Sequence, residues 1–301
     1  MTARRILVIK LAALGDVVQA FGPFAAIRAH HPEAEITLLT TPPFAPLLAR
    51  APWFDRIWPD GRPGWRGLPA LALKLRRGRF DRVYDLQTSG RSSRYRWLTG
   101  AVPWSGVQSH HAANPARNSL HTVERQREQL AIAGITEFPP PALDWLDDPL
   151  EGFALPQRFV LLVPGASPGR PGKRWPVARF AELARRLEVP PVVLGGPAEA
   201  PLAAEILQAR PDGLDLTGKT TLAQIGALGR RADAAVGNDT GPTHMLAAAG
   251  CPTLAVFGSD SDPALCAPRG PRAAWLRRDS IAAIPAEAVE AELRALLART
   301  A

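Results

Sequence analysis

The stretch Arg4-Arg-Ile-Leu-Val-Ile9 is a short apolar run rich in β-branched residues, and the turn Gly15-Asp16 follows it closely. Apolar residues at helical spacing then extend from Val17 to His30. A strand, a glycine turn and a helix in this order open a parallel α/β sheet. Further strands are predicted at residues 36–40 and 79–86, so the amino-terminal part of the chain is predicted to be a doubly wound parallel sheet.

A Pro-rich, acidic stretch from Phe138 to Pro156 has no sustained period and is predicted to link two domains. After it the alternation of strands and helices restarts, with strands expected at residues 159–163, 192–194, 234–237 and 253–257. The predicted fold class is therefore α/β, with two parallel-sheet domains at residues 1–150 and 157–285 and a C-terminal helix at 286–301.

The chain has 301 residues, of which 46% are hydrophobic and 21% charged, as in proteins with a sizeable buried core. Its two cysteines are too few for a disulfide framework and lack the CxxC spacing of a zinc site, which favours a reducing cytoplasm. The amino-terminal apolar run is broken by Lys10, and no stretch reaches about 18 uninterrupted apolar residues. Neither a signal peptide nor a membrane span is therefore predicted.

The formal net charge is +8, from 36 Lys and Arg against 28 Asp and Glu. Such a balance admits nucleic acid, an anionic membrane surface or a phosphorylated ligand as a partner. Only four of the cationic residues are lysines, which indicates a drift toward arginine-rich codons at least as much as a binding patch. The charge alone does not choose among these partners.

Ligands of open parallel sheets bind beyond the carboxyl ends of the strands, so the loops there are the candidates for chemistry. In the first of them, Asp16 either caps the N–H groups of a helix start or projects a carboxylate into the cleft, and the residues alone favour the cap. The basic loop from Pro164 to Pro176 brings Lys173 near backbone N–H groups that suit a phosphate, although a mobile surface loop explains it equally well. It lacks the Walker A spacing, and the chain contains no GxGxxG.

The most specific segment is Val236-Gly-Asn-Asp-Thr-Gly-Pro-Thr-His244, in which a predicted strand ends in small polar residues and enters a helix at Pro242. The N–H groups of a helix start, the Thr hydroxyls and His244 together suit a diphosphate. In contrast, the pair Asp260-x-Asp262 precedes a proline, which favours an Asp-capped turn over a metal site. Neither cysteine has a neighbouring histidine, so a cysteine-based nucleophilic triad is not supported.

Together these segments resemble glycosyltransferase family 9, the heptosyltransferases of lipopolysaccharide core assembly, over nearly the whole chain. The first strand with Gly15-Asp16 is similar to the family's opening segment, and Asp81–Gln87, with Arg91 after it, is similar to its Asp-Leu-Gln segment. The family's carboxyl-terminal donor-site blocks are similar to Lys173-Arg-Trp-Pro176, Gly195-Gly-Pro-Ala-Glu199, Leu216-Thr-Gly-Lys219 and Gly237–His244, of which the last is the most specific.

The resemblance implies a GT-B fold, with two Rossmann-like domains that face each other across a cleft. The first domain binds mainly the acceptor, the second binds the nucleotide-sugar, and the final helix often crosses back onto the first. It implies an inverting transfer, without metal or cofactor, in which Asp16 is the catalytic base, and it places Gln87 and Arg91 on the acceptor side. On the donor side it implies that Lys173 neutralises the leaving diphosphate and that Glu199 forms a hydrogen bond to the ribose. Asp239 orders the loop or contacts the sugar. The residues that contact phosphate oxygens are Thr240, Gly241 and His244.

The implied reaction moves a heptose from ADP-heptose to a lipopolysaccharide core or other glycolipid acceptor. It takes place at the cytoplasmic face of the inner membrane and involves no nucleic acid.

The sequence departs from the family at two places. Ala12-Ala13 stand where several members carry hydroxyl residues, and the loop 258–263 is one residue longer than usual. The first puts the affinity for the donor, or its identity, in question. Three alternatives stay open: another nucleotide-sugar donor, an epimerase of the same fold, and a nucleic-acid-binding protein with Arg91–Trp97 as its only short candidate.

Overall fold

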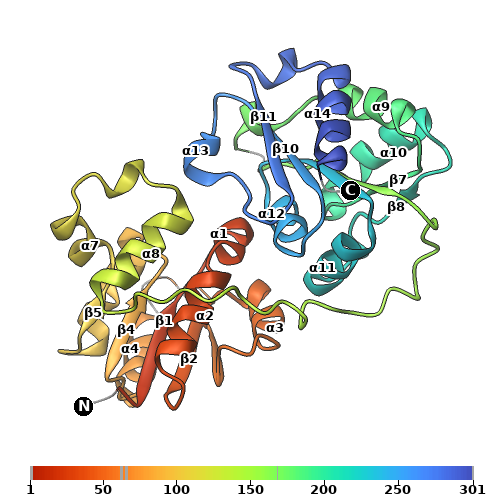
Figure 1. Cartoon of the computed structure of the whole chain (residues 1–301). Helices are drawn as coiled ribbons and strands as arrows, with labels where there is room; N and C mark the ends of the chain where they lie inside the picture. The colour runs from red at the N-terminus through yellow and green to blue at the C-terminus, as the bar shows by residue number, and fades with distance from the viewer. Residues whose placement is uncertain (1–2, 62–63, 65–66, 168, 300–301) are drawn as a thin grey trace. The chain divides into compact units, whose positions relative to one another are not determined.

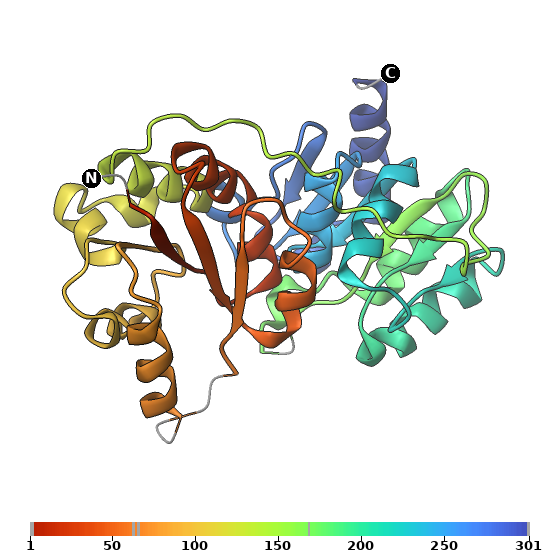
Figure 2. The same ribbon diagram turned by 90° about the horizontal axis from the view of Figure 1, so that it is seen from below.

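The computed structural model describes residues 3–61, 64, 67–167 and 169–299. The chain divides into two compact units, residues 1–145 and 146–301. Each unit holds one parallel sheet with helices on its faces (Figures 1 and 2). The segment that joins α8 (Thr122–Ile132) to β6 (Val160–Val163) carries neither helix nor strand, and the predicted linker 138–156 lies within it.

The first sheet has the strand order β3-β2-β1-β4-β5, with all neighbours parallel. Its strands are β1 (Arg5–Ile9), β2 (Glu35–Thr40), β3 (Arg56–Pro59), β4 (Arg82–Asp85) and β5 (Trp104–Ser105). The register places Ile6 opposite both Ile36 and Arg82. Because β1 lies between β2 and β4, the chain leaves β1 toward one edge of the sheet and later returns to its other side.

The helices of the first unit are α1 (Leu14–Val18), α2 (Phe21–His30), η1 (Pro42–Phe44), α3 (Ala45–Leu48), α4 (Leu68–Arg77), α5 (Gly90–Arg94), α6 (Arg96–Thr99), α7 (Val107–Ala113), η2 (Arg117–Ser119) and α8 (Thr122–Ile132). On one face of the sheet, α4 and α6 pack in contact with each other over a core that includes Leu7, Val83 and Leu75. Helices α2 and α8 also contact each other (Figure 1).

The single helix predicted at 17–30 is wrong, because the structure has two helices there, α1 and α2, separated by Gln19 and Ala20. Pro23 supplies the physical reason. Its missing N–H could not bond to the carbonyl of Gln19 in one continuous helix, so the chain turns before Pro23 and restarts with the proline inside the first turn of α2.

The second sheet has the strand order β11-β10-β9-β6-β7-β8 and is also parallel throughout. Its strands are β6 (Val160–Val163), β7 (Pro191–Val193), β8 (Leu214–Asp215), β9 (Ala234–Asn238), β10 (Thr253–Phe257) and β11 (Ala273–Arg277). Its helices are η3 (Pro171–Lys173), α9 (Val177–Arg186), η4 (Pro197–Glu199), α10 (Ala200–Ala209), α11 (Leu222–Arg231), α12 (Gly241–Ala248), α13 (Pro263–Cys266), η5 (Ile281–Ala283) and α14 (Ala286–Ala298).

The last helix, α14, packs on its own unit. Val289, Leu293 and Leu296 are buried, and α14 contacts α9 and β10. The prediction that this helix also reaches the first domain stays a prediction, and residues 300–301 of the predicted helix lie outside the described residues. Among the described residues, none of the helices combines the length and apolar character needed to span a bilayer.

The strand orders locate one switch point in each sheet, where consecutive crossovers leave in opposite directions. In the first sheet it lies between β1 and β4, and in the second between β6 and β9. Ligands of open α/β sheets bind beyond the carboxyl ends of the strands at such points. The loops after β1, β4, β6 and β9 are therefore where a site is expected, and they carry most of the candidate residues.

Candidate functional site

The buried side chain of Asn238 ties together the two loops at the switch point of the second sheet. Its Oδ1 accepts a hydrogen bond from the backbone N–H of Trp175 (3.0 Å), and its Nδ2 donates to the carbonyl oxygens of Pro164 (2.8 Å) and Gly165 (3.2 Å). Both ends of the loop after β6 are thus held against the end of β9. Asn238 belongs to the motif 236–244, but its role is visible only in the fold.

Lys173, Asp239 and His244 form a connected triad at this point. Lys173 Nζ lies 2.5 Å from Oδ2 of Asp239, and Nε2 of His244 lies 3.1 Å from Oδ1 of the same carboxylate. Burial opposes ionisation of Asp239, but the hydrogen bonds from His244 and Lys173 outweigh it and hold the pKa of Asp239 far below its usual range. The carboxylate therefore stays charged and holds Lys173 in position.

The start of α12 follows Asp239 directly. Thr240 is the N-cap residue, Gly241 opens the helix, and the hydroxyl of Thr243 donates to the carbonyl of Asn238 (2.7 Å). A Cβ on Gly237 would lie 2.5 Å from Oγ1 of Thr243, so only glycine allows this close approach. The exposed N–H groups and the dipole of a helix start favour an anion beside Lys173.

Glu199, the predicted ribose ligand, sits in η4, after the end of β7. Its Oε2 accepts from the backbone N–H of Gly196 (2.8 Å). Cβ atoms on Gly165 or Gly195 would come within 2.9 Å and 2.7 Å of the Glu199 side chain, so this side chain packs across the loops that follow β6 and β7. Glu199 thus lies against the segment that Asn238 anchors. The predicted donor residues all follow the carboxyl ends of β6, β7 and β9.

The two acidic residues of the loop 258–263 have structural partners. Asp260 Oδ2 accepts from the N–H of Gly172 (2.9 Å), which holds the Lys173 loop from its other side. Asp262 caps α13 by accepting from the N–H of Ala264 (3.0 Å), which confirms the predicted Asp-capped turn. No cluster of three or more His, Cys, Asp and Glu side chains suited to a metal ion occurs among the described residues.

Cys266 is the residue that sequence reasoning missed beside the triad. Its Sγ lies 3.7 Å from Oδ2 of Asp239. Burial, reinforced by the neighbouring carboxylate, raises the pKa of the Cys266 thiol to about 12. The thiol is therefore uncharged at neutral pH and does not compete with Asp239 for Lys173. Only the fold reveals it, because the two residues are 27 positions apart.

In the first unit Asp16 is exposed at the third position of α1, after β1. Its Oδ2 accepts from the backbone N–H of Ala13 (3.1 Å), and Ala13 is the N-cap residue. The prediction that Asp16 itself is the N-cap is thus wrong: the carboxylate reaches back to the cap from within the helix. Close to it, Lys10 is buried and donates to the carbonyl of Leu86 (3.0 Å). Burial lowers the pKa of Lys10, and the charges of Asp16 and Asp85 oppose that shift.

Gln87 and Arg91 both hold neighbouring segments. Gln87 Oε1 accepts from the N–H groups of Leu11 (2.8 Å) and Ala12 (3.1 Å), and so fixes the loop that carries Asp16. Nη2 of Arg91 bonds both carboxylate oxygens of Asp60, at 2.9 Å and 2.8 Å. Their part in binding an acceptor stays a prediction, since the contacts seen are within the protein.

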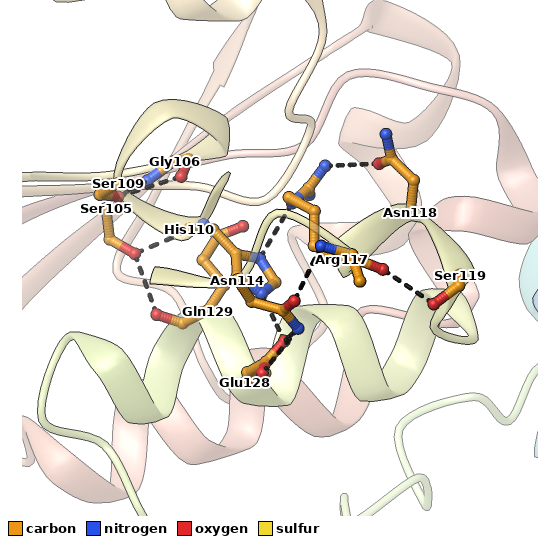
Figure 3. Close-up of polar contacts among 11 residues, drawn as sticks. Ser105, Gly106, Ser109, His110, Asn114, Arg117, Asn118, Ser119, Glu128 and Gln129 are labelled. Atoms are coloured by element: carbon orange, nitrogen blue, oxygen red, sulfur yellow. Dashed lines mark hydrogen bonds and ion pairs between the residues drawn. The ribbon is translucent and has the colours of Figure 1, made fainter. Parts of the chain in front are cut away.

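A second buried polar network in the first unit, centred on His110, escaped the sequence analysis (Figure 3). His110 is fully buried between α7 and α8, and its Nε2 lies 2.6 Å from Oε2 of Glu128. Arg117 Nε donates to His110 Nδ1 (3.1 Å), and Asn114 Nδ2 donates to Glu128 (3.0 Å). Since Arg117 can only donate, Nδ1 of His110 is the acceptor and Nε2 carries the proton toward Glu128. No local pattern signals a contact between residues 18 positions apart on two helices.

The sequence and the fold can both be compared with known proteins. The family model described as glycosyltransferase family 9 (heptosyltransferase) matches residues 69–292. Lipopolysaccharide heptosyltransferase 2 of Escherichia coli K12 is 30% identical over 292 residues, which cover 85% of this chain and 83% of that protein. Its counterpart from Salmonella typhimurium LT2 is 29% identical over the same shares of the two chains.

Two solved structures share the architecture. The E. coli ADP-heptose LPS heptosyltransferase II superposes with a TM-score of 0.79 at 26% identity and covers 98% of this chain and 99% of its own. The family 9 glycosyltransferase of Veillonella parvula superposes with a TM-score of 0.84 at 23% identity, over 98% and 97% of the two chains. With the two parallel sheets seen here, these matches confirm the expected GT-B fold.

Proposed function

The chain belongs to glycosyltransferase family 9, the heptosyltransferases, and from this premise we propose that it transfers a heptose from ADP-heptose to a lipopolysaccharide core acceptor by a single inverting displacement. In this reaction the acceptor hydroxyl oxygen attacks C1 of the sugar, the bond from C1 to the diphosphate breaks, and ADP leaves with the electron pair. The observation that carries the proposal is the triad of Lys173, Asp239 and His244 at the start of α12.

The donor side of the proposal rests on charge. A leaving diphosphate gains negative charge in the transition state, and preorganised donors stabilise that charge because they need no reorientation. Lys173 is already held by Asp239, which lies directly before the N-cap residue of α12. We assign the phosphate oxygens to Lys173, Thr240, Gly241 and His244, and the ribose to Glu199. Asp239 orders the loop through its two hydrogen bonds.

The base in the proposal is Asp16. It is an exposed carboxylate in the first turn of α1, the helix that follows β1 at the switch point of the first sheet, where an acceptor is expected to bind. A carboxylate at this place can accept the proton of the acceptor hydroxyl as the new bond to C1 forms. Gln87 supports Asp16 by fixing the loop in front of it, and Arg91 is assigned to the acceptor side.

The setting of the proposal follows from the relatives. Their names are those of lipopolysaccharide enzymes, and one of the solved structures is named as an ADP-heptose enzyme. We therefore assign acceptor binding to residues 1–150 and donor binding to residues 157–285, and we place the protein in the cytoplasm, peripheral to the inner membrane.

The test is a transfer assay with three donors, ADP-heptose, GDP-mannose and UDP-glucose, on heptose-deficient core acceptor, with the product identified by mass spectrometry and its configuration at C1 by NMR. Transfer from ADP-heptose with inversion at C1 supports the proposal. Transfer from another donor only would show that the donor is different, with Ala12-Ala13 as the first residues to examine. Conversion of a nucleotide-sugar into its epimer without any acceptor would replace the proposal with an isomerising function.

A further inference from the structure

The formal net charge of +8 comes entirely from the first unit. Residues 1–145 contain 19 Lys and Arg against 11 Asp and Glu, whereas residues 146–301 contain 17 of each. Within the first unit the charge is concentrated further. No Asp or Glu occurs between Asp60 and Asp81, or between Asp85 and Glu124, and these two stretches contain α4 and α6. The unit therefore presents a strong positive field where these helices lie.

The same two helices expose large apolar side chains. Trp97 of α6 is 79% exposed, Leu73 of α4 is 50% exposed and Leu68, at the start of α4, is 44% exposed. Among the described residues, the only other large hydrophobic side chains with comparable exposure are those of Ile132 and Trp275. Exposed apolar residues scattered singly need no explanation, but three of five on one pair of touching helices form a patch.

The packing of α4 and α6 puts their outer sides on one face of the unit. Leu71 and Leu75 of α4 and Leu98 of α6 point into the same core, over one face of the sheet. The residues on the opposite sides of both helices therefore face away from that core together. In Figure 2, α4 is the orange helix at the lower left, at the periphery of its unit. We call this surface the α4–α6 face and define it by Leu68, Leu73, Arg76 and Arg77 of α4, Arg96 and Trp97 of α6, and Arg94, the last residue of the adjoining α5.

The four arginines of the α4–α6 face are exposed. In the part of the chain that the structure describes, none of them forms an ion pair. A pocket of about 390 Å³ adjoins this face and shares Leu73 and Arg77 with it. Its other cationic residues are Arg5, Arg56 and Lys74, its acidic residue is Glu35, and Trp58 adds an aromatic side chain. A pocket with this lining suits a phosphate group attached to an apolar chain.

From these observations we infer that the α4–α6 face is the surface by which the protein docks on an anionic phospholipid bilayer. Arginines attract the anionic headgroups, while Trp97, Leu68 and Leu73 enter the boundary between headgroups and acyl chains, as in interfacial helices. A nucleic acid explains the composition of this face less well, because exposed leucine side chains neither stack on bases nor bind phosphates. The inference rests on the proposed function only for its lipid setting, since binding to vesicles requires neither donor nor acceptor.

The test is sedimentation of the full chain with vesicles of phosphatidylcholine alone or of an equimolar mixture with phosphatidylglycerol. We expect binding to the mixed vesicles to exceed that to the neutral ones by about tenfold or more and to fall as salt is added. Trp97→Ala and the double variant Arg76→Glu/Arg77→Glu are each expected to lower binding by about tenfold. The matched controls, Trp275→Ala and Arg185→Glu/Arg231→Glu, change an equally aromatic and an equally basic exposed site of the second unit and are expected to bind like the wild type.

Three outcomes overturn the inference: no preference for anionic vesicles, an equal loss in the face variants and in the controls, or binding of single-stranded DNA by a protein that does not bind the vesicles. Transfer to a water-soluble core fragment is measured in parallel. Trp97→Ala is expected to retain it, so loss of vesicle binding with retained transfer separates the docking face from the catalytic site. Vesicle binding without any transfer would contradict the proposed function alone.

Discussion

Lys173 and Asp239 are 66 positions apart in the chain, and their charged atoms lie 2.5 Å apart. The contact joins the loop after β6 to the end of β9, the two strands on either side of the switch point of the second sheet. It restrains the otherwise flexible side chain of Lys173, so less conformational entropy is lost when a diphosphate binds. Asp239 is in turn held by His244, which leaves the position of the lysine dependent on the whole triad.

Substitution of Lys173 should therefore weaken nucleotide binding. We expect Lys173→Ala to raise the Kd for ADP by about 10- to 100-fold, because a charge-assisted hydrogen bond to phosphate contributes roughly 1.5–3 kcal/mol. Titration calorimetry measures the change. Arg158→Ala is the matched control, since Arg158 is a surface cation of the same unit that pairs with Asp233 at 2.8 Å. Equal affinities of the two variants for ADP would remove Lys173 from the donor site.

Asp16→Asn separates catalysis from binding. Asparagine keeps an oxygen that can accept from the N–H of Ala13, so α1 should begin as before, but the amide cannot take a proton. We expect the transfer rate to fall by about 10²- to 10⁴-fold, the usual contribution of a general base, while the Kd for ADP is unchanged. The exposed Asp144→Asn serves as control. A transfer rate in Asp16→Asn close to that of the wild type would exclude Asp16 as the base.

The alternation of apolar runs and helical periods was sufficient to predict the two parallel sheets. The strands predicted correctly, such as β1 and β10, are central or next to central and carry continuous apolar runs. The strands that were missed, β3, β5, β8 and β11, lie at or near the edges of their sheets. Two of them have only two residues, and in β3 none of the side chains is fully buried. Edge strands of this kind carry too little pattern to be recognised.

The candidate site divides in the same way. Residues that are close in sequence, such as Asp239 and His244, were found because one motif contains them both. The supports that hold the motif were not found, because Asn238 and Asp260 act on segments 63 to 88 positions away. Such long-range hydrogen bonds leave no periodicity in the sequence, and only the closed fold brings their partners together.

The network around His110 should contribute to stability. Glu128→Ala removes the acceptor for Nε2–H of the fully buried His110 and for Nδ2 of Asn114. Leaving a buried donor without a partner costs about 1–3 kcal/mol, so we expect the free energy of unfolding in urea to fall by that amount. Glu137→Ala, which changes an exposed glutamate beyond the end of α8, should leave it unchanged.

The protonation of His110 provides a second readout of this network. The donor Arg117 fixes the tautomer with the proton on Nε2, and nitrogen-resolved NMR of the histidine ring distinguishes it from the alternative. A spectrum with the proton on Nδ1, or a Glu128→Ala variant as stable as Glu137→Ala, would contradict the network as described.

The last prediction concerns Asp85, which is buried at the end of β4 beside the proposed acceptor region. Burial raises the pKa of its carboxyl to about 6. The N–H groups of Thr88 and Gln87 donate to Oδ1 and partly oppose this rise. Among the described residues, Oδ2 has no hydrogen-bond partner. A carboxyl with a raised pKa binds its proton more tightly in the folded state than in the unfolded one. Its contribution to stability is therefore largest at low pH and declines as the pH rises from about 4 to about 6.

Asp85→Asn should remove this decline. With the pKa raised from its ordinary value to about 6, the carboxylate costs up to about 3 kcal/mol at neutral pH. We expect the wild type to lose stability relative to the variant between pH 4 and pH 6, measured as urea unfolding at several pH values. Two parallel stability profiles would show that Asp85 does not titrate in this range. A steeper decline in the variant would reverse the sign of the argument, because it would mean that the unfolded chain holds the proton more tightly than the buried site.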